Sequence, residues 1–94
     1  MIELSVLIPT YNRAGSLDRA LDSLNNQTYE KSFRCIIADN CSSDQTKSVV
    51  EKWKSKEKNF EIEYYKHEKE LLPIDNWESL INRSETKYSK ILFD

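Results

Sequence analysis

The sequence predicts an α/β domain built on one parallel sheet, with four strands that alternate with three helices. Two observations predict this fold. The spacing of apolar residues changes several times along the chain, from short continuous runs typical of buried strands to the period of a helix. Each run is separated from the next by one helical stretch, and a strand, helix and strand in succession form a right-handed crossover between parallel strands. The 94 residues allow one domain, covering 1–94.

The first strand and helix are predicted from a short apolar run and a leucine stripe. Leu4 to Ile8 is apolar and partly β-branched, and we expect Pro9 to end this strand. Gly15 and Ser16 then supply a helix start. The next apolar residues stand at i, i+3, i+4 and i+7, which places them on one helix face: Leu17, Ala20, Leu21 and Leu24.

The second strand and helix follow the same scheme. Phe33 to Ala38 has strand character, and the polar segment from Asp39 to Asp44 is typical of a turn. One residue of this loop must cap the helix that follows, and we favour Ser43 or Asp44 over Asp39. The apolar face of this helix is predicted to contain Thr46, Val49, Val50 and Trp53.

The last elements are shorter. Ile62 to Lys66 favours extended structure, and Pro73 suits the first turn of a helix. That helix is predicted to bury one face, made of Trp77, Leu80, Ile81 and Ser84. Tyr88 to Phe93 is predicted as the fourth strand. The complete order is that of a Rossmann-like parallel sheet.

Net charge and composition narrow the function. The chain has 14 basic against 16 acidic residues, so its net charge of -2 gives no general attraction to nucleic acid or anionic lipid. One histidine and two cysteines are too few for a zinc site of four Cys and His ligands. No apolar run approaches the roughly 20 residues of a membrane helix, and the start lacks the basic residues of a secretory signal. We therefore expect a cytoplasmic protein that binds no nucleic acid.

Open α/β sheets bind their ligands beyond the carboxyl ends of the strands. In this sequence the residues that we select there are Pro9, Thr10, Tyr11, Arg13, Asp39, Lys66 and Asp94. A glycine-rich phosphate loop is absent, because Gly15 is the only glycine. Tyr11 instead offers a ring for a base, and Arg13 a cation for phosphate. An ordinary strand-to-helix turn is the alternative interpretation of this loop.

Two aspartates follow apolar strands at the same edge. Asp39 can accept a hydrogen bond from an imide N–H or a ribose hydroxyl, and its alternative role is structural. Asp94 ends the last apolar run. Because one carboxylate alone binds a divalent cation weakly, we expect any partner acid beyond residue 94.

Several segments, in this order and spacing, resemble the start of family 2 glycosyltransferases. They are Val6 to Arg13, the helix ending at Asn26 to Tyr29, Ile36 to Thr46, Asn76-Trp77, and Ile91 to Asp94. The resemblance covers nearly all of the chain. It implies the N-terminal, nucleotide-sugar-binding half of a GT-A domain, cut before the half that binds the acceptor.

The resemblance also implies roles for the selected residues. Thr10 and Tyr11 would lie against the nucleoside, with Arg13 near it or the diphosphate. Asp39 would accept a hydrogen bond from the base, usually uracil. Asp94 matches the opening acid of the family's Asp-x-Asp motif and is the one candidate of this chain for a metal, Mn²⁺ or Mg²⁺. The following acid and the catalytic base are expected beyond residue 94, so the chain alone is expected to be inactive.

The implied reaction transfers a sugar with inversion from a nucleoside diphosphate, expected to be UDP, to a hydroxyl of a saccharide or lipid-linked acceptor. Such a reaction serves polysaccharide or glycolipid synthesis. For the full-length protein, peripheral association with the inner face of a membrane is left open. Many family members have a glycine-containing Asn-x-Gly segment after the third strand, whereas Lys66 to Pro73 has no glycine, so the donor sugar stays open.

A non-catalytic binding or assembly module is the alternative function. A receiver-type signalling domain is excluded, because it needs a carboxylate where this first strand ends in Pro9, Thr10 and Tyr11. Unpaired edges of a truncated sheet also predict self-association.

Overall fold

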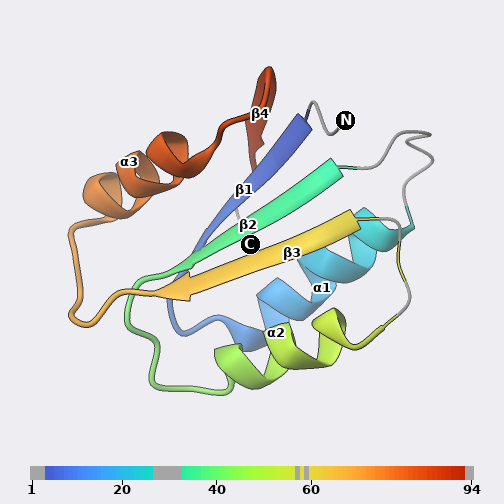
Figure 1. The fold of residues 1–94 in the computed structure, drawn as a ribbon. Helices are drawn as coiled ribbons and strands as arrows, with labels where there is room; N and C mark the ends of the chain where they lie inside the picture. The colour runs from blue at the N-terminus through green and yellow to red at the C-terminus, as the bar shows by residue number, and fades with distance from the viewer. Residues whose placement is uncertain (1–3, 27–32, 57, 59, 93–94) are drawn as a thin grey trace.

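The described residues, 4–26, 33–56, 58 and 60–92, form four strands and three helices in a computed structural model (Figure 1). In chain order they are β1 (Leu4–Thr10), α1 (Ala14–Asn25), β2 (Phe33–Asp39), α2 (Thr46–Lys54), β3 (Phe60–Lys66), α3 (Pro73–Arg83) and β4 (Tyr88–Ile91). The predicted alternation of strands and helices is confirmed.

The strands form one sheet in the order β3-β2-β1-β4, and every neighbouring pair is parallel. This confirms the predicted Rossmann-like sheet. The register pairs Thr10 with Asp39, and Asp39 with Lys66. Three of the residues selected from the sequence therefore end adjacent strands at one edge of the sheet.

One face of the sheet is covered by α1 and α2 (Figure 1). Among the described residues, this face has a cluster of buried side chains that consists of Val6, Ile8, Leu17, Leu21, Leu24, Phe33, Cys35, Ile37, Val50, Trp53 and Phe60. The cluster includes the three leucines of the predicted α1 stripe, and Val50 and Trp53 of the predicted α2 face. The rings of Phe33 and Phe60 stack within it, with centroids 4.9 Å apart. Burial raises the pKa of the Cys35 thiol to about 12, so this cysteine acts as an apolar core residue.

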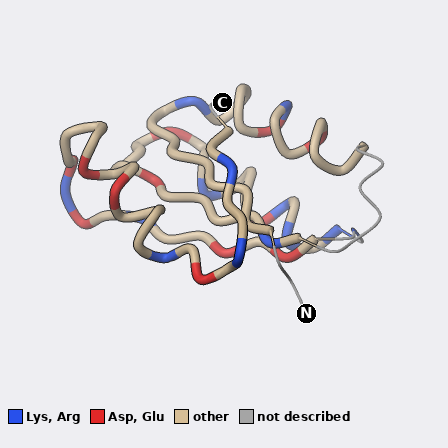
Figure 2. Tube along the Cα trace, turned by 90° about the horizontal axis from the view of Figure 1, so that it is seen from above, with Lys and Arg blue, Asp and Glu red and all other residues tan. Residues whose placement is uncertain are grey.

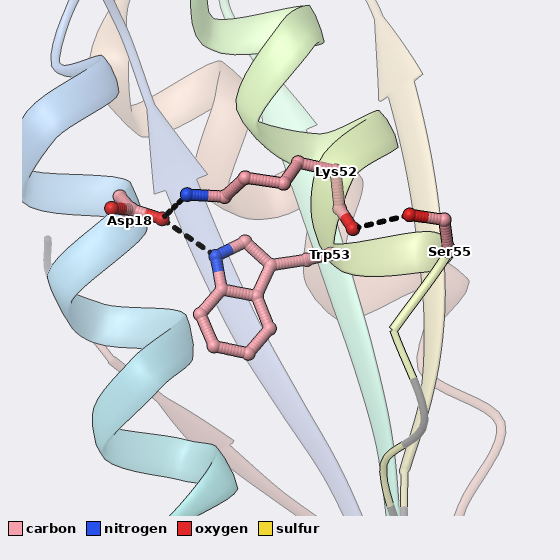
Figure 3. Close-up of polar contacts among 4 residues, drawn as sticks. All are labelled: Asp18, Lys52, Trp53 and Ser55. Carbon is pink, nitrogen blue, oxygen red and sulfur yellow. Dashed lines mark hydrogen bonds and ion pairs between the residues drawn. The ribbon is translucent and has the colours of Figure 1, made fainter.

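A polar contact fastens the two helices of this face to each other (Figure 3). Asp18 of α1 accepts hydrogen bonds on one carboxylate oxygen from Lys52 Nζ and from Trp53 Nε1 of α2, both at 2.7 Å. Trp53 thus buries its ring in the core and still satisfies its N–H. The bonds from Lys52 and Trp53 lower the pKa of Asp18.

The opposite face is covered by α3 (Figure 1) and has a smaller apolar cluster. Its buried members among the described residues are Leu7, Ile36, Ala38 and Leu80. Polar and aromatic contacts supplement it. Tyr65 hydrogen-bonds Ser79 at 2.8 Å, and the guanidinium of Arg83 lies 3.9 Å from the centre of the Tyr65 ring.

Three expectations differ from the structure. Pro9 does not end the first strand but pairs with Ala38 inside β1. The backbone groups of alternate residues in a strand point to the same neighbouring strand. Leu7 O accepts a hydrogen bond from Leu92 N, on the side of β4, so the backbone nitrogen of Pro9 also points to the side of β4. The pairing of β1 with the described part of β4 ends at Leu7, so the missing N–H costs no bond of the described ladder. β4 ends at Ile91, with Phe93 outside the described residues.

The third difference concerns the buried face of α3. The helix buries Asn76 and Leu80, whereas Ile81 is 53% exposed and Trp77 only partly buried. The predicted buried face of α3 was therefore wrong at one end, because the polar side chain of Asn76 is buried where Trp77 was expected. Asn76 is accommodated there by hydrogen bonds to Ala38 O at 3.2 Å and to the ring of His67 at 2.7 Å.

Charged residues of both signs are interspersed along the described trace (Figure 2). Within the described part of the chain, no helix has the length and apolar character that crossing a membrane requires.

Candidate functional site

The loop between β1 and α1 is fixed by bonds to the loop between β2 and α2. Asn12 adopts a left-handed conformation (φ 49°), which asparagine tolerates better than most residues. Its backbone N–H donates to Ser42 Oγ at 2.8 Å, and its side-chain Oδ1 accepts from the backbone N–H of Ser43 at 2.7 Å. Tyr11 and Arg13 therefore flank a turn with a defined conformation.

Asp44 joins the starts of two helices. One carboxylate oxygen accepts from the backbone N–H and the hydroxyl of Thr46, the first residue of α2. The other accepts from the backbone N–H of Ala14, the first residue of α1, at 3.1 Å. The bond from Thr46 is the main cause of the lowered pKa of Asp44. The N-cap of α2 is Gln45, so the prediction that Ser43 or Asp44 caps this helix was wrong, although Asp44 bonds the first residue of both helices.

Asp39 is 1% exposed and already bonded within the protein. One carboxylate oxygen accepts from the backbone N–H of Ser42 at 2.8 Å, and the other accepts from the hydroxyl of Tyr64 at 2.6 Å. Burial and the bond to Asp39 raise the pKa of Tyr64 far above its ordinary value. Asp39 therefore has the structural role that the sequence left as its alternative, and each oxygen keeps a second lone pair for another donor.

Asn40 attaches the loop between β3 and α3 to the carboxyl end of β2. Its Nδ2 donates to Leu71 O at 2.8 Å, and its Oδ1 accepts from Leu71 N at 2.7 Å. Its own backbone N–H donates to Thr10 O at 2.9 Å. The end of β1, the loop after β2 and the loop after β3 thus meet at Asn40.

These loops surround a cavity of about 410 Å³ at the carboxyl edge of the sheet. The lining residues are Pro9, Thr10, Tyr11, Arg13, Asn40, Glu70, Leu71, Pro73, Asn76 and Trp77. The volume is in the range of pockets that hold small organic ligands. The first four are the residues selected from the first loop.

The other selected residues lie differently. Asp39 lies beneath this edge and is not part of the lining, and Lys66 is exposed at the end of β3, outside the cavity wall. Asp94 lies outside the described residues. The donor contacts of these three residues therefore stay predictions.

Six of the ten residues of the cavity wall were not selected from the sequence. Asn40 was noted as part of a turn and of a segment that carried the family resemblance, Trp77 was assigned to a buried helix face, and Glu70 had no assigned role. Asn76 and Trp77 did belong to a segment that carried the family resemblance, which was the available signal. Nothing in the local sequence indicates that Asn40 bonds Leu71, 31 residues further on.

Opposite charges face this cavity from two loops. Arg13 comes from the first loop and Glu70 from the third. Tyr11 is 43% exposed, and the nearby carboxylate of Glu70 raises the pKa of its hydroxyl. The cavity therefore contains a cation, a carboxylate and an aromatic ring, a combination suited to a polar ligand with a ring and an anionic group.

The described residues do not form a complete metal site. No three His, Cys, Asp or Glu side chains gather within them in a way that could hold an ion. Asp94, the residue predicted to face a metal, is outside this part of the chain. The described residues could therefore bind a metal ion only together with ligands from outside this part of the chain.

The sequence and fold assign the chain to one family. The pattern of glycosyl transferase family 2 matches residues 5–92, and the chain belongs to this family. The abequosyltransferase RfbV of Salmonella typhimurium is 33% identical over 86 residues, which are 90% of this chain and 26% of RfbV.

A second relative is the poly(ribitol-phosphate) beta-N-acetylglucosaminyltransferase TarS of Staphylococcus aureus. It is 40% identical over 57 residues, which are 60% of this chain and 10% of TarS. The crystal structure of TarS 1-349 in complex with UDP has a TM-score of 0.82 at 28% identity and covers 98% of this chain and 27% of that chain.

The mannosyltransferase PcManGT from Pyrobaculum calidifontis, solved with GDP-Man and Mn²⁺, has the same fold. Its TM-score is 0.78 at 20% identity, over 87% of this chain and 24% of that chain. These similarities confirm the predicted GT-A fold. The chain spans between 10% and 26% of the length of the two curated relatives.

Proposed function

We propose that the chain forms the nucleotide-sugar-binding part of a glycosyltransferase whose donor is a UDP-linked sugar. One observation carries this proposal. The four residues selected from the first loop line a single cavity at the carboxyl edge of the sheet, in a chain that belongs to glycosyl transferase family 2. The complex of TarS with UDP supports uridine as the nucleoside.

Each residue has a role suited to its chemistry. The ring of Tyr11 lies against the base, and the guanidinium of Arg13 binds the diphosphate through charge-assisted hydrogen bonds. Asp39 accepts an additional hydrogen bond from the base, beside those from Ser42 and Tyr64. Lys66 adds positive charge at the rim of the same edge.

The whole protein transfers the sugar with inversion to a hydroxyl of a saccharide or lipid-linked acceptor, in polysaccharide or glycolipid synthesis. The catalytic base, the acceptor-binding half and a second acid for a divalent cation lie beyond residue 94 in this proposal, so the chain alone is inactive. Asp94 is the residue of this chain that faces the cation.

Two further expectations belong to this proposal. The protein acts in the cytoplasm, with a peripheral place at the inner face of a membrane open for the full-length form. The chain by itself associates through its open sheet edges, β3 and β4. Light scattering tests the second expectation, and a monodisperse monomer would contradict it.

Calorimetric titration with UDP and GDP, each with and without Mn²⁺, tests the proposed function. The titration uses this chain and the complete protein that contains it. We expect UDP to bind the complete protein in a metal-dependent way and this chain more weakly. Arg13→Ala should weaken UDP binding by about tenfold, the loss of one charge-assisted bond to phosphate.

The matched control is Arg19→Ala, which removes an exposed arginine of α1 outside the cavity wall. It should leave UDP affinity unchanged. Folded protein that binds neither nucleotide would reject the proposal and favour the non-catalytic module.

A further inference from the structure

Arg13 and Glu70 give the cavity two separate charges. Both line the wall, and within the described residues neither takes part in an ion pair. Opposite charges on one cavity that do not neutralise each other are available to different parts of one ligand. A diphosphate is attracted to the first and repelled by the second.

The loop that presents Glu70 is held on its C-terminal side. Leu71, the next residue, makes two backbone hydrogen bonds with the side chain of Asn40. Two residues later Pro73 begins α3, and it also lines the cavity. The backbone beside Glu70 is therefore fixed relative to the carboxyl end of β2, so the carboxylate is directed from a positioned loop.

The carboxylate of Glu70 shares the cavity wall with the hydroxyl-bearing ring of Tyr11. Tyr11 itself lines the cavity and is 43% exposed, so its hydroxyl can turn away when a ligand enters. A carboxylate on a cavity wall that is in no ion pair of the described residues can accept hydrogen bonds from uncharged O–H donors. A carboxylate has two acceptor oxygens, and two neighbouring hydroxyls can donate to both at once.

We propose that Glu70 binds a vicinal diol of the donor and that Arg13 binds its diphosphate, so that the two charges fix the direction in which the donor lies. This inference rests on the proposed function and adds Glu70 as a specificity-determining residue. Carboxylates bind ribose hydroxyls in other α/β nucleotide sites, which shows that the chemistry is suitable. The diol can belong to the ribose or to the transferred sugar, and the experiment separates these sources.

Glu70→Gln tests the inference, because it keeps the size of the side chain and removes its charge and one acceptor. UDP, 2′,3′-dideoxy-UDP and UDP-glucose are titrated into the complete protein and into this chain. If Glu70 binds the ribose, the variant loses about tenfold in UDP affinity and nothing in dideoxy-UDP affinity. If it binds the sugar, UDP affinity is unchanged and UDP-glucose affinity falls about tenfold.

Glu68→Gln is the matched control, since Glu68 is exposed on the same loop and does not line the cavity. It should bind all three ligands like the parent protein. Equal or tighter binding of both UDP and UDP-glucose by Glu70→Gln would overturn the inference and leave the proposed function intact. An equal loss for all three ligands would also overturn it, because the dideoxy compound lacks the ribose diol. Failure of the parent protein to bind UDP would reject both proposals.

Discussion

The two faces of the sheet are built differently. The face under α1 and α2 has eleven buried apolar side chains in the described part of the chain, and the face under α3 has four. On the second face, Tyr65, Ser79, Asn76 and His67 supply hydrogen bonds in place of additional apolar contacts. The layer formed by α3 contributes side chains to the cavity wall, whereas the layer formed by α1 and α2 contributes none. The difference indicates that one face supplies most of the stability, while the other positions part of the site.

Truncating one leucine on each face gives the largest expected effect. Leu21 of α1 and Leu80 of α3 are both fully buried. We expect Leu21→Ala to lower the free energy of unfolding by about 4 kcal/mol and Leu80→Ala by about 2.5 kcal/mol. The second loss is smaller because a single helix with fewer apolar neighbours can settle into the space. Urea unfolding followed by circular dichroism measures both.

Ile81→Ala is the control for these variants, because Ile81 is 53% exposed on α3. It should change the free energy of unfolding by less than about 0.5 kcal/mol. A larger loss for Leu80→Ala than for Leu21→Ala would contradict the proposed division of stability between the faces.

Two adjacent tyrosines, one on each face of the sheet, allow a second comparison, with an intermediate expected effect on the free energy of unfolding. Tyr64 faces the α1 and α2 layer and donates to the buried carboxylate of Asp39, while Tyr65 faces α3 and bonds Ser79. Tyr64→Phe removes a hydrogen bond to a charged group and should cost about 2 kcal/mol. Tyr65→Phe removes a neutral bond and should cost about 0.5–1 kcal/mol. Thermal unfolding of the two variants side by side gives the ranking, and equal costs would show that Asp39 does not depend on Tyr64.

The smallest expected effect concerns the contact between α1 and α2, and it depends on pH. Asp18 has a lowered pKa in the folded chain, because it accepts from Lys52 and Trp53. Its contribution is therefore complete above the pKa of the unfolded chain, about 4, and is lost as the pH falls through the lower folded value. The pair with Lys52 is partly exposed, so Asp18→Asn should cost less than about 1 kcal/mol at pH 7.

Chemical unfolding of the parent chain and Asp18→Asn at several pH values measures this contribution. The difference between them should shrink below about pH 4. Asp22→Asn, an exposed change on the same helix, serves as control. A difference that stays constant down to pH 2 would mean that the charge of Asp18 does not matter.

Much of the fold could be predicted because periodicity reports which side of an element is apolar. The leucine stripe of α1 and the buried Val50 and Trp53 of α2 were found in this way, whereas Pro9, expected to end the first strand, lies within β1. The orientation of α3 could not be predicted, because Asn76 is buried by hydrogen bonds to Ala38 and His67, not by its own hydrophobicity. The place of Glu70 on the cavity wall was equally hidden, since it depends on where the fold brings the loop between β3 and α3.

The side chains of Asn12, Asn40 and Asp44 join three loops before any ligand arrives. A wall assembled in this way loses little conformational entropy when a ligand binds. Backbone amides of these loops should therefore exchange slowly with solvent in the free chain and change little on binding. Only side chains such as Tyr11 then adjust when a ligand binds. The affinity depends mainly on the contacts formed, because ordering the site costs little free energy.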